Sequence, residues 1–321
     1  MRTKRFAALV CILAAGASLS LGAAALTPAQ VWEALLSGPG SVAGRIFWYA
    51  RLPRTAACLL AGAALSVAGC VIQNVLANPL ASPNIIGVNA GAGLAVTVCC
   101  AFGAMSGWVM AGAAFGGAFL AVLLVSLAAQ AVGASRTSTI LAGVAVNAFL
   151  GAASDAVTSL IPDAAVLSSD FRVGGFGSVA HTRLIPAGVL ILAALAAVML
   201  LRNELEILSL GEDTARSLGL NAPRMRTVFL ALAAMLSGGA VSFAGLLGFV
   251  GLIVPHAVRR FAGTNCGRLL PLSALWGAAF VTVCDLIARL AFRPKELSVG
   301  ILLSALGGPF FLYMLSKRRG S

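Results

Sequence analysis

The sequence predicts an all-α polytopic membrane protein with about ten transmembrane helices, in a single domain spanning residues 1–321. Of the 321 residues, 60% are hydrophobic and only 10% are charged, whereas soluble domains contain roughly 25% charged residues. The 81 residues from Thr55 to Ser135 include no Asp, Glu, Lys, Arg or His. Since one helical span needs about 20 apolar residues, this run alone accommodates about three spans.

The first apolar run, residues 6–26, follows a cationic start and includes Gly22-Ala23-Ala24-Ala25 near its end. The pattern fits a signal peptide with an A-x-A cleavage site or an uncleaved first span. The length of the run is unusual for a signal peptide and suits a span, so we favour the span. In the more polar residues 27–54, Thr27 before Pro28 predicts the start of a short helix on the outer surface.

Five further spans are expected before the longest charged segment. Two prolines in the stretch from Asn78 to Asn84 separate the first two of these spans on the inner side. Residues 133–138 are expected to form an inner loop and residues 162–183 an outer loop. Three small-residue pairs predict close helix packing: Gly87 with Gly91, Gly103 with Gly107, and Gly112 with Gly116. The predicted spans cover residues 55–77, 85–102, 108–132, 139–161 and 184–201.

The last part of the chain contains an apolar stretch with three glycines and one proline, Gly245 to His256, after a predicted span over residues 227–244. Broken backbone at membrane depth persists only where protein buries it or where it lines a cavity. We therefore expect an intramembrane turn or broken helix, with one kinked span as the alternative. An eighth span follows, and two more cover residues 270–290 and 297–315. The loop from Arg293 to Glu296 is expected outside and the end Lys317-Arg318-Arg319 inside. This topology puts 14 of the 22 cations inside, as the positive-inside rule favours.

Composition and spacing also exclude several classes of site. The net charge of +12 arises from cations between apolar spans, without a basic run interleaved with aromatics, so no nucleic-acid partner is expected. The seven cysteines lie mostly inside apolar runs, and neither His181 nor His256 has a second ligand at metal-binding spacing, so we expect no metal or cofactor. Asp155, an acid inside a predicted span, is either a substrate or proton site or a hydrated position near the outer mouth.

The charged inner segment, about residues 203–223, predicts a short soluble helix. Ser209 and Glu212 match a capping box, and Glu212 and Arg216 suit the two ends of a helix dipole. Gly219 suits the C-terminal cap. Ala215 and Leu218 share a face with no lipid to bury it, which indicates docking to a cytoplasmic partner. A plain connector packed on its own spans is the alternative.

Several motifs, in the same order along about residues 45–315, resemble the permease subunits of ABC importers for iron chelates (siderophores), haem and vitamin B12. The N-terminal half contributes Arg51-Leu52-Pro53-Arg54, Asn78-Pro79-Leu80-Ala81-x-Pro83 and Leu141-Ala142-Gly143-Val144-Ala145. The C-terminal half contributes Gly248-Phe249-Val250-Gly251-Leu252-Ile253-Val254-Pro255-His256, Asp285-x-x-Ala288-Arg289 and Gly307-Gly308-Pro309-Phe310-Phe311.

The resemblance implies a type II ABC importer permease fold with ten spans, in which two subunits surround a central pathway. It also implies roles for residues. The extracytoplasmic binding protein would dock on Arg51, Arg54 and Arg289, and the broken-helix motif would include Gly248, Gly251, Pro255 and His256. The gate or pathway would include Asn78, Pro79, Leu80, Pro83, Thr137 and Ser138, although Arg136 departs from the expected hydroxyl residue. ATPase coupling would involve Ser209, Leu210, Gly211, Glu212, Ala215, Arg216, Leu218 and Gly219.

The implied partners are two ATPase subunits, an extracytoplasmic binding protein and a second permease copy, in a bacterial cytoplasmic (inner) membrane with both termini cytoplasmic. The sequence contains no G-x-x-x-x-G-K-[ST] phosphate-binding loop, so ATP must be hydrolysed by a separate subunit and the chain is not expected to be an enzyme. The alternatives are an ion-gradient-driven secondary transporter or an intramembrane enzyme. The sequence leaves the cargo open between an iron-siderophore, haem and a corrinoid, with Phe171 and Phe176 as residues that would face it.

Overall fold

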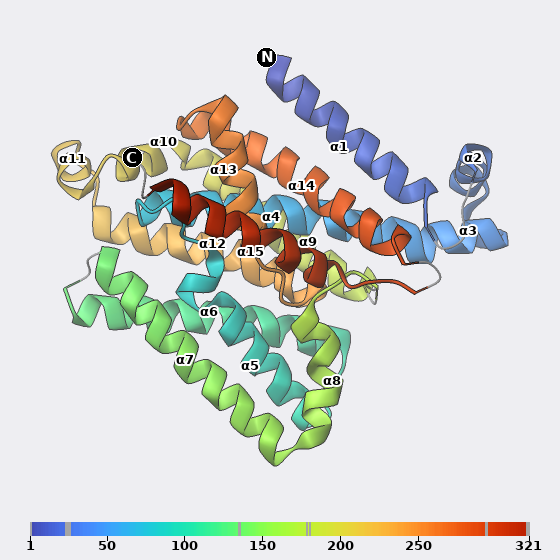
Figure 1. The fold of residues 1–321 in the computed structure, drawn as a ribbon, viewed down its shortest axis with the longest axis horizontal. Coiled ribbons are helices and arrows are strands. Elements are labelled where there is room, and N and C mark those ends of the chain that lie inside the picture. The colour runs from blue at the N-terminus through green and yellow to red at the C-terminus, as the bar shows by residue number, and fades with distance from the viewer. Residues whose placement is uncertain are drawn as a thin grey trace.

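The computed structural model describes residues 2–22, 27–133, 136–177, 179, 181–292 and 295–318. All regular secondary structure in this part of the chain is helical (Figure 1). The expectations at Ala23 to Ala25, Arg293 and Arg319 lie outside the described residues. Ten helices match the ten predicted spans one for one. They are α1 (Arg2–Ser20), α4 (Leu52–Val75), α5 (Val88–Ala101), α6 (Gly107–Ala131), α7 (Arg136–Leu160), α9 (His181–Leu200), α12 (Ala222–Ala244), α13 (Val250–Ala262), α14 (Cys266–Leu290) and α15 (Val299–Arg318).

These ten helices differ in length. Among the described residues, six stretches are long and apolar enough to cross a membrane, and a seventh qualifies if α9 and the bent helix after it count as one span. Helices α5 and α15 are shorter apolar helices, and α13 has only 13 residues. The chain is therefore an all-helical polytopic membrane protein with seven to ten spans.

The remaining helices are short and lie at the two ends of the bundle, which are called outer and inner here according to the expected topology. Near the outer end they are α2 (Pro28–Ser37), η1 (Gly38–Gly40), α3 (Val42–Ile46), η2 (Phe47–Arg51) and α8 (Pro162–Val173); η3 (Pro83–Ile86), α10 (Arg202–Ser209) and α11 (Glu212–Ser217) complete the set. The predicted start at Thr27 is confirmed, because its side chain accepts a hydrogen bond from Gln30 N in a complete capping box.

The predicted outer loop 162–183 is corrected by the structure, since its first half is the helix α8. Pro162 occupies the first turn and Asp163 follows it, as the start of a helix favours. The apolar content of this segment is too low for a span, which is why the sequence suggested a loop.

Helices α4 and α12 form the centre of the molecule, with α14, α13 and α1 on one side and α5 to α8 on the other (Figure 1). In the apolar windows of α4 and α12, 78% of residues are buried, against 17% in α1 and in α7. Small residues allow the close approach: Gly62 contacts Gly277 of α14, and Gly91 contacts Gly117 of α6. Within this subunit Gly112 and Gly116 make no such close approach, because a Cβ at either position would meet nothing within 4 Å.

Candidate functional site

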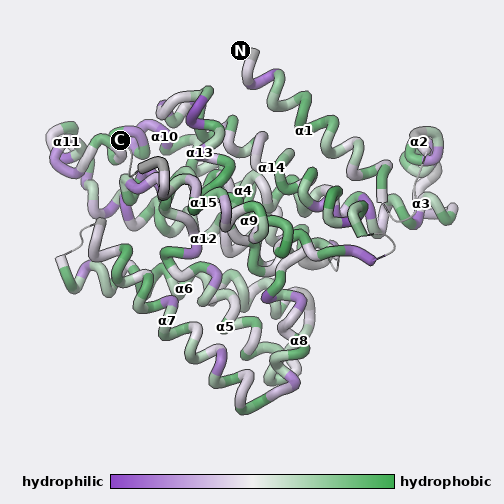
Figure 2. Tube along the Cα trace, in the orientation of Figure 1, coloured by the Kyte–Doolittle hydropathy of each residue, from purple (hydrophilic) through white to green (hydrophobic). Residues whose placement is uncertain are grey.

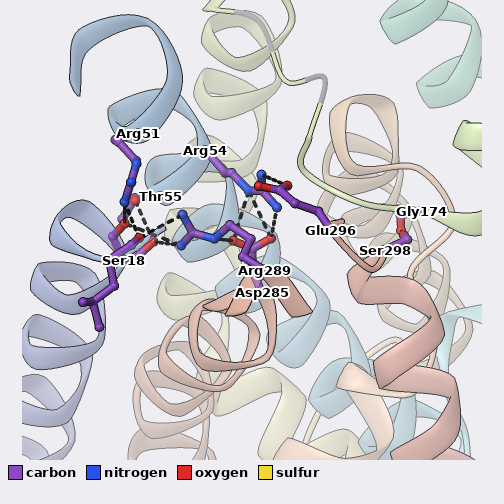
Figure 3. Close-up of polar contacts among 10 residues, drawn as sticks. Ser18, Arg51, Arg54, Thr55, Gly174, Asp285, Arg289, Glu296 and Ser298 are labelled. Atoms are coloured by element: carbon purple, nitrogen blue, oxygen red, sulfur yellow. Dashed lines mark hydrogen bonds and ion pairs between the residues drawn. The ribbon is translucent and has the colours of Figure 1, made fainter. Parts of the chain in front are cut away.

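Five charged residues at the outer end of the bundle form one connected network (Figure 3): Arg51, Arg54, Asp285, Arg289 and Glu296. Arg54, at the start of α4, donates through Nε and Nη2 to both carboxylate oxygens of Asp285 on α14, at 2.9–3.2 Å. Its Nη1 donates to Glu296 at 2.7 Å. The Asp285 side chain is 1% exposed, Arg54 14% and Glu296 38%, so the network leads from the interior to the outer surface.

A second arginine of this network reaches α1. Arg289 lies one turn after Asp285 on α14 and pairs with it at 3.0 Å. Its Nη2 donates to Ser18 Oγ at 2.8 Å, and Ser18 Oγ also bonds to Thr55 Oγ1 at 2.8 Å. Arg51 donates to the backbone carbonyls of Ser18 and Leu21. Two arginines therefore cap the C-terminal carbonyls of α1, as cations at a helix C-terminus favour.

This arrangement divides the three predicted docking arginines into two kinds. Arg51 and Arg289 are only 5% and 2% exposed and hold α1 in place. Arg54 lines a cleft of about 300 Å³ on the outer surface together with Glu296, Asp170 and Phe176. Of the network's side chains, Arg54 and Glu296 line this cleft, and both are more exposed than Asp285 or Arg289.

The broken helix predicted at residues 245–256 is confirmed. Helix α12 ends at Ala244, and α13 begins at Val250, with left-handed backbone at Gly245 (φ 71°) and Phe249 (φ 64°) between them. Leu246 N donates to Phe171 O at 2.9 Å, and Gly175 N donates to Ala244 O at 2.8 Å. The end of α8 thus satisfies backbone groups that the break leaves open, as burial at membrane depth requires.

The residues after the break pack closely on α4. Gln73 Nε2 donates to the carbonyl of Gly251 at 3.0 Å, and a Cβ on Gly69 would overlap the same carbonyl. A Cβ on Gly251 would lie 3.3 Å from Pro83 Cδ. Pro255 lies inside α13, and the ring of His256 packs edge-on against Phe310 of α15 at 5.7 Å. Gly248, the fourth predicted motif residue, lies in the break, 3.9 Å from Asn84 Nδ2 by its Cβ position.

The predicted gate residues form a turn between α4 and α5. The Asn78 side chain accepts a hydrogen bond from Leu80 N at 3.0 Å, Pro79 lies between them in the turn, and Pro83 is buried at the start of η3. Helix α7 reaches this turn through Asn147, whose Nδ2 donates to Asn84 O at 2.8 Å.

Thr137 and Ser138 are placed differently from the other gate residues. They lie in the first turn of α7, where Ser138 Oγ donates to Val132 O at 3.3 Å. Farther along the same helix, Asn147 bonds to the turn between α4 and α5, although the sequence did not single this residue out.

The predicted coupling segment forms two short helices, α10 and α11, at the inner end. The capping box is wrong: Ser209 closes α10 and donates to Glu206 O at 2.7 Å, while Gly211 (φ 121°) precedes α11 without a side-chain cap. The predicted Gly219 cap is confirmed, since Gly219 has φ 81° and Leu220 N donates to Ala215 O at 2.9 Å.

Glu212 ties α11 to the bundle instead of capping it. Its carboxylate accepts hydrogen bonds from Arg226 of α12 at 2.9 Å and from Arg216 at 2.8 Å. The hydrogen bond from Arg226, followed by the charges of both arginines, holds the pKa of Glu212 below its usual range. Ala215 is fully buried against its own chain, while Leu210 and Leu218 are 63% and 61% exposed. The exposed apolar surface of this segment therefore includes Leu210 and Leu218 but not Ala215.

The remaining polar candidates have ordinary surroundings. Asp155 is exposed near the outer end of α7 and pairs with Arg172 of α8 at 3.4 Å, which agrees with the hydrated position. The His181 ring bonds to Trp48 O at 3.1 Å. Within the described ranges, no group of three His, Cys, Asp or Glu could hold a metal ion.

Known proteins place this arrangement in a family. The family model described as the FecCD transport family matches residues 9–317. The hemin transport system permease protein HmuU of Yersinia pestis is 33% identical over 97% of this chain and 94% of its own length. The iron(3+)-hydroxamate import system permease protein FhuB of Bacillus subtilis is 35% identical over 97% of this chain and 82% of its own.

A solved structure of a metal-chelate type transporter has a similar fold. An inward-facing conformation of a putative metal-chelate type ABC transporter matches 98% of this chain and 99% of its own, at 26% identity and a TM-score of 0.86. The match covers the bundle, the break before α13 and the inner helices together. The chain belongs to the FecCD transport family, as a permease subunit of the iron-chelate and haem ABC importers.

Proposed function

We propose that this permease forms the translocation pathway for an iron-siderophore or haem complex, delivered by an extracytoplasmic binding protein and driven by two separate ATPase subunits. A corrinoid remains the third cargo class. The names of the relatives, hemin and iron(3+)-hydroxamate systems, support the iron-containing classes. The observation that carries the mechanism is the inner segment α10–α11, which exposes apolar residues and is ionically tied to a central helix.

Coupling would run from the ATPase through α11 to the break before α13. Leu210 and Leu218 present the apolar surface for the ATPase, with Arg216 exposed beside them. Glu212 joins this helix to Arg226, the fifth residue of α12. The other end of α12 is the break at Gly245. A displacement of α11 would therefore reach the segment between α12 and α13, whose residues 246–248 belong to neither helix.

The coupling test uses Leu218→Asp. A charge at this contact is costly to bury unless it is paired, so we expect the ATPase to dissociate or to hydrolyse ATP without transport. The measurements are co-purification with the ATPase and uptake by reconstituted vesicles. Leu36→Asp, at a 73% exposed leucine of the outer helix α2, is the matched control and should change neither. Normal association and uptake in Leu218→Asp would leave α10–α11 a plain connector.

Docking of the binding protein is proposed at Arg54, with Arg51 and Arg289 behind it. Arg54 and Glu296 reach the outer cleft, and an arginine fork suits a carboxylate of the partner. Arg51 and Arg289 line a neighbouring cleft with Arg54 and Glu296, while they also donate to the carbonyls of α1. Arg54→Glu should weaken binding of the extracytoplasmic protein and lower its salt sensitivity, while assembly with the ATPase is retained. Unchanged affinity would remove Arg54 from the interface.

We further propose that two copies of the chain enclose the pathway, in the cytoplasmic membrane with both termini inside. Self-pairing is the default for closed symmetry, and α7 leaves most of its surface uncovered in the single subunit. A purified complex with two different permease chains would contradict the homodimer. ATP-independent uptake driven by an ion gradient would instead favour a secondary transporter.

A further inference from the structure

A cleft of about 320 Å³ lies where the start of α1 meets the end of α13 and the start of α14, apart from the sites described above. Two of its side chains are cationic, one carries a hydroxyl, and three are apolar. The lining residues are Lys4, Arg268, Thr3, Phe261, Ala262 and Leu272. Helices α1, α13 and α14 line the cleft at the end of the bundle that the proposed topology puts at the inner face of the membrane. Their arrangement can be followed in Figure 1.

The charge of the cleft is positive and unopposed. Lys4 and Arg268 are exposed, and neither forms an ion pair with any residue of the described ranges. Neither α1 nor residues 250–272 contain an Asp or Glu. Glu206 of α10 approaches this corner, but its carboxylate accepts hydrogen bonds from Asn265 Nδ2 at 3.0 and 3.3 Å.

An apolar surface continues from the cleft along α1 and α14 (Figure 2). Trp276, one turn beyond Leu272, packs with Phe6 and Phe261, with ring centroids 6.1 Å apart in each pair. Phe6 and Phe261 are 58% and 52% exposed. The cations therefore lie at the polar end of a surface that no described protein element covers.

We propose that this cleft binds the head group of an anionic phospholipid from the cytoplasmic leaflet. Lys4 and Arg268 would hold the phosphate, and an acyl chain would lie against Phe6 and Phe261. Basic pockets between transmembrane helices on the cytoplasmic side suit anionic head groups. The adjoining apolar surface favours a lipid over a free phosphate, because a soluble anion would leave it uncovered. The proposal rests on the inward orientation of this end.

Trp276 provides the readout for a test on the full-length permease in nanodiscs. Its fluorescence, taken as the difference between wild type and Trp276→Phe, is measured with brominated-chain phosphatidylglycerol or brominated-chain phosphatidylcholine. We expect stronger quenching by phosphatidylglycerol at equal mole fraction. Removal of both charges in Lys4→Gln/Arg268→Gln should lower this preference about 25-fold, or about five-fold per cation.

The control is Arg202→Gln, at an exposed inner cation of α10, which should keep the preference. Equal quenching by the two lipids, or an unchanged preference in Arg268→Gln, overturns the proposal. Arg268→Gln lies outside α1, so it remains informative if Lys4→Gln alters insertion of the first span. Loss of the preference on adding millimolar inorganic phosphate would assign the cleft to a soluble anion. Labelling of Lys4→Cys by an impermeant reagent from outside would instead contradict the proposed orientation.

Discussion

The outer and inner ends of this permease handle their charged residues in opposite ways. At the outer end, Arg54 and Arg289 share the buried Asp285, and two arginines hold the last carbonyls of α1. At the inner end, Glu212 and its arginines are part of a short helix whose flanking leucines are exposed. The outer charged network is thus bonded within one subunit, whereas the inner charged helix lies between two exposed leucines, Leu210 and Leu218.

The difference teaches that arginines with the same proposed family role can have different bonding partners within the subunit. The resemblance groups Arg51, Arg54 and Arg289 as docking residues. In the structure Arg51 and Arg289 donate to carbonyls of α1, whereas Arg54 pairs with Asp285 and Glu296. The comparison can be broken by variants that should affect one end only.

The largest effect is expected from Asp285→Asn at the outer end. This change leaves the buried Arg289 and the partly buried Arg54 without their shared carboxylate, and breaking a buried pair in this way costs about 3–5 kcal/mol. The measurement is the free energy of unfolding in detergent or lipid. Glu296→Gln, at a 38% exposed partner, should cost at most about 1 kcal/mol. Equal effects of the two variants would mean that the network is solvated rather than buried.

Two glycine-to-alanine substitutions test the same comparison through the backbone instead of through charge. A Cβ on Gly300 would overlap the carbonyl oxygen of Val173, so Gly300→Ala should destabilise the outer end by about 1–3 kcal/mol. Gly219 has no atom within 4 Å of its Cβ position and only a left-handed φ of 81°, so Gly219→Ala should cost about 1 kcal/mol, confined to α11. Hydrogen exchange resolved by segment would separate the two. Loosening of the outer end by Gly219→Ala would contradict this division.

The smallest effect concerns pH at the inner end. The pKa of Glu212 is lowered in the folded chain, so its contribution to stability is complete above its unfolded pKa of about 4.3 and is lost as pH falls through the folded value. We expect exchange in α11, corrected for intrinsic rates, to increase below about pH 4.3, and Glu212→Gln to remove this dependence. A pH response that persists in Glu212→Gln would have to come from another group.

Much of the fold could be predicted because apolar length and broken patterns are local properties. The interruption at Gly245 and the cap at Gly219 were both visible in sequence. The capping box at Ser209 failed because Ser209 completes α10, a helix boundary that the charged segment does not reveal. The union of Arg289 with Ser18 could not be predicted, since the two residues are 271 positions apart and only the assembled bundle joins them. A polar Ser18 at the end of an apolar run was the one local indication.

The same separation has a consequence for biosynthesis. At roughly 5–20 residues per second, a ribosome needs about 15–55 s to progress from Ser18 to Arg289, which lie 271 residues apart. During that interval the first helix lacks α14, its main neighbour, and has only Arg51 to cap its carbonyls. In a nascent chain that stops before α14, the first helix is therefore mostly in contact with lipid. In the complete chain the same helix packs on α14. Membrane quality control could recognise that helix long before transport can be assayed.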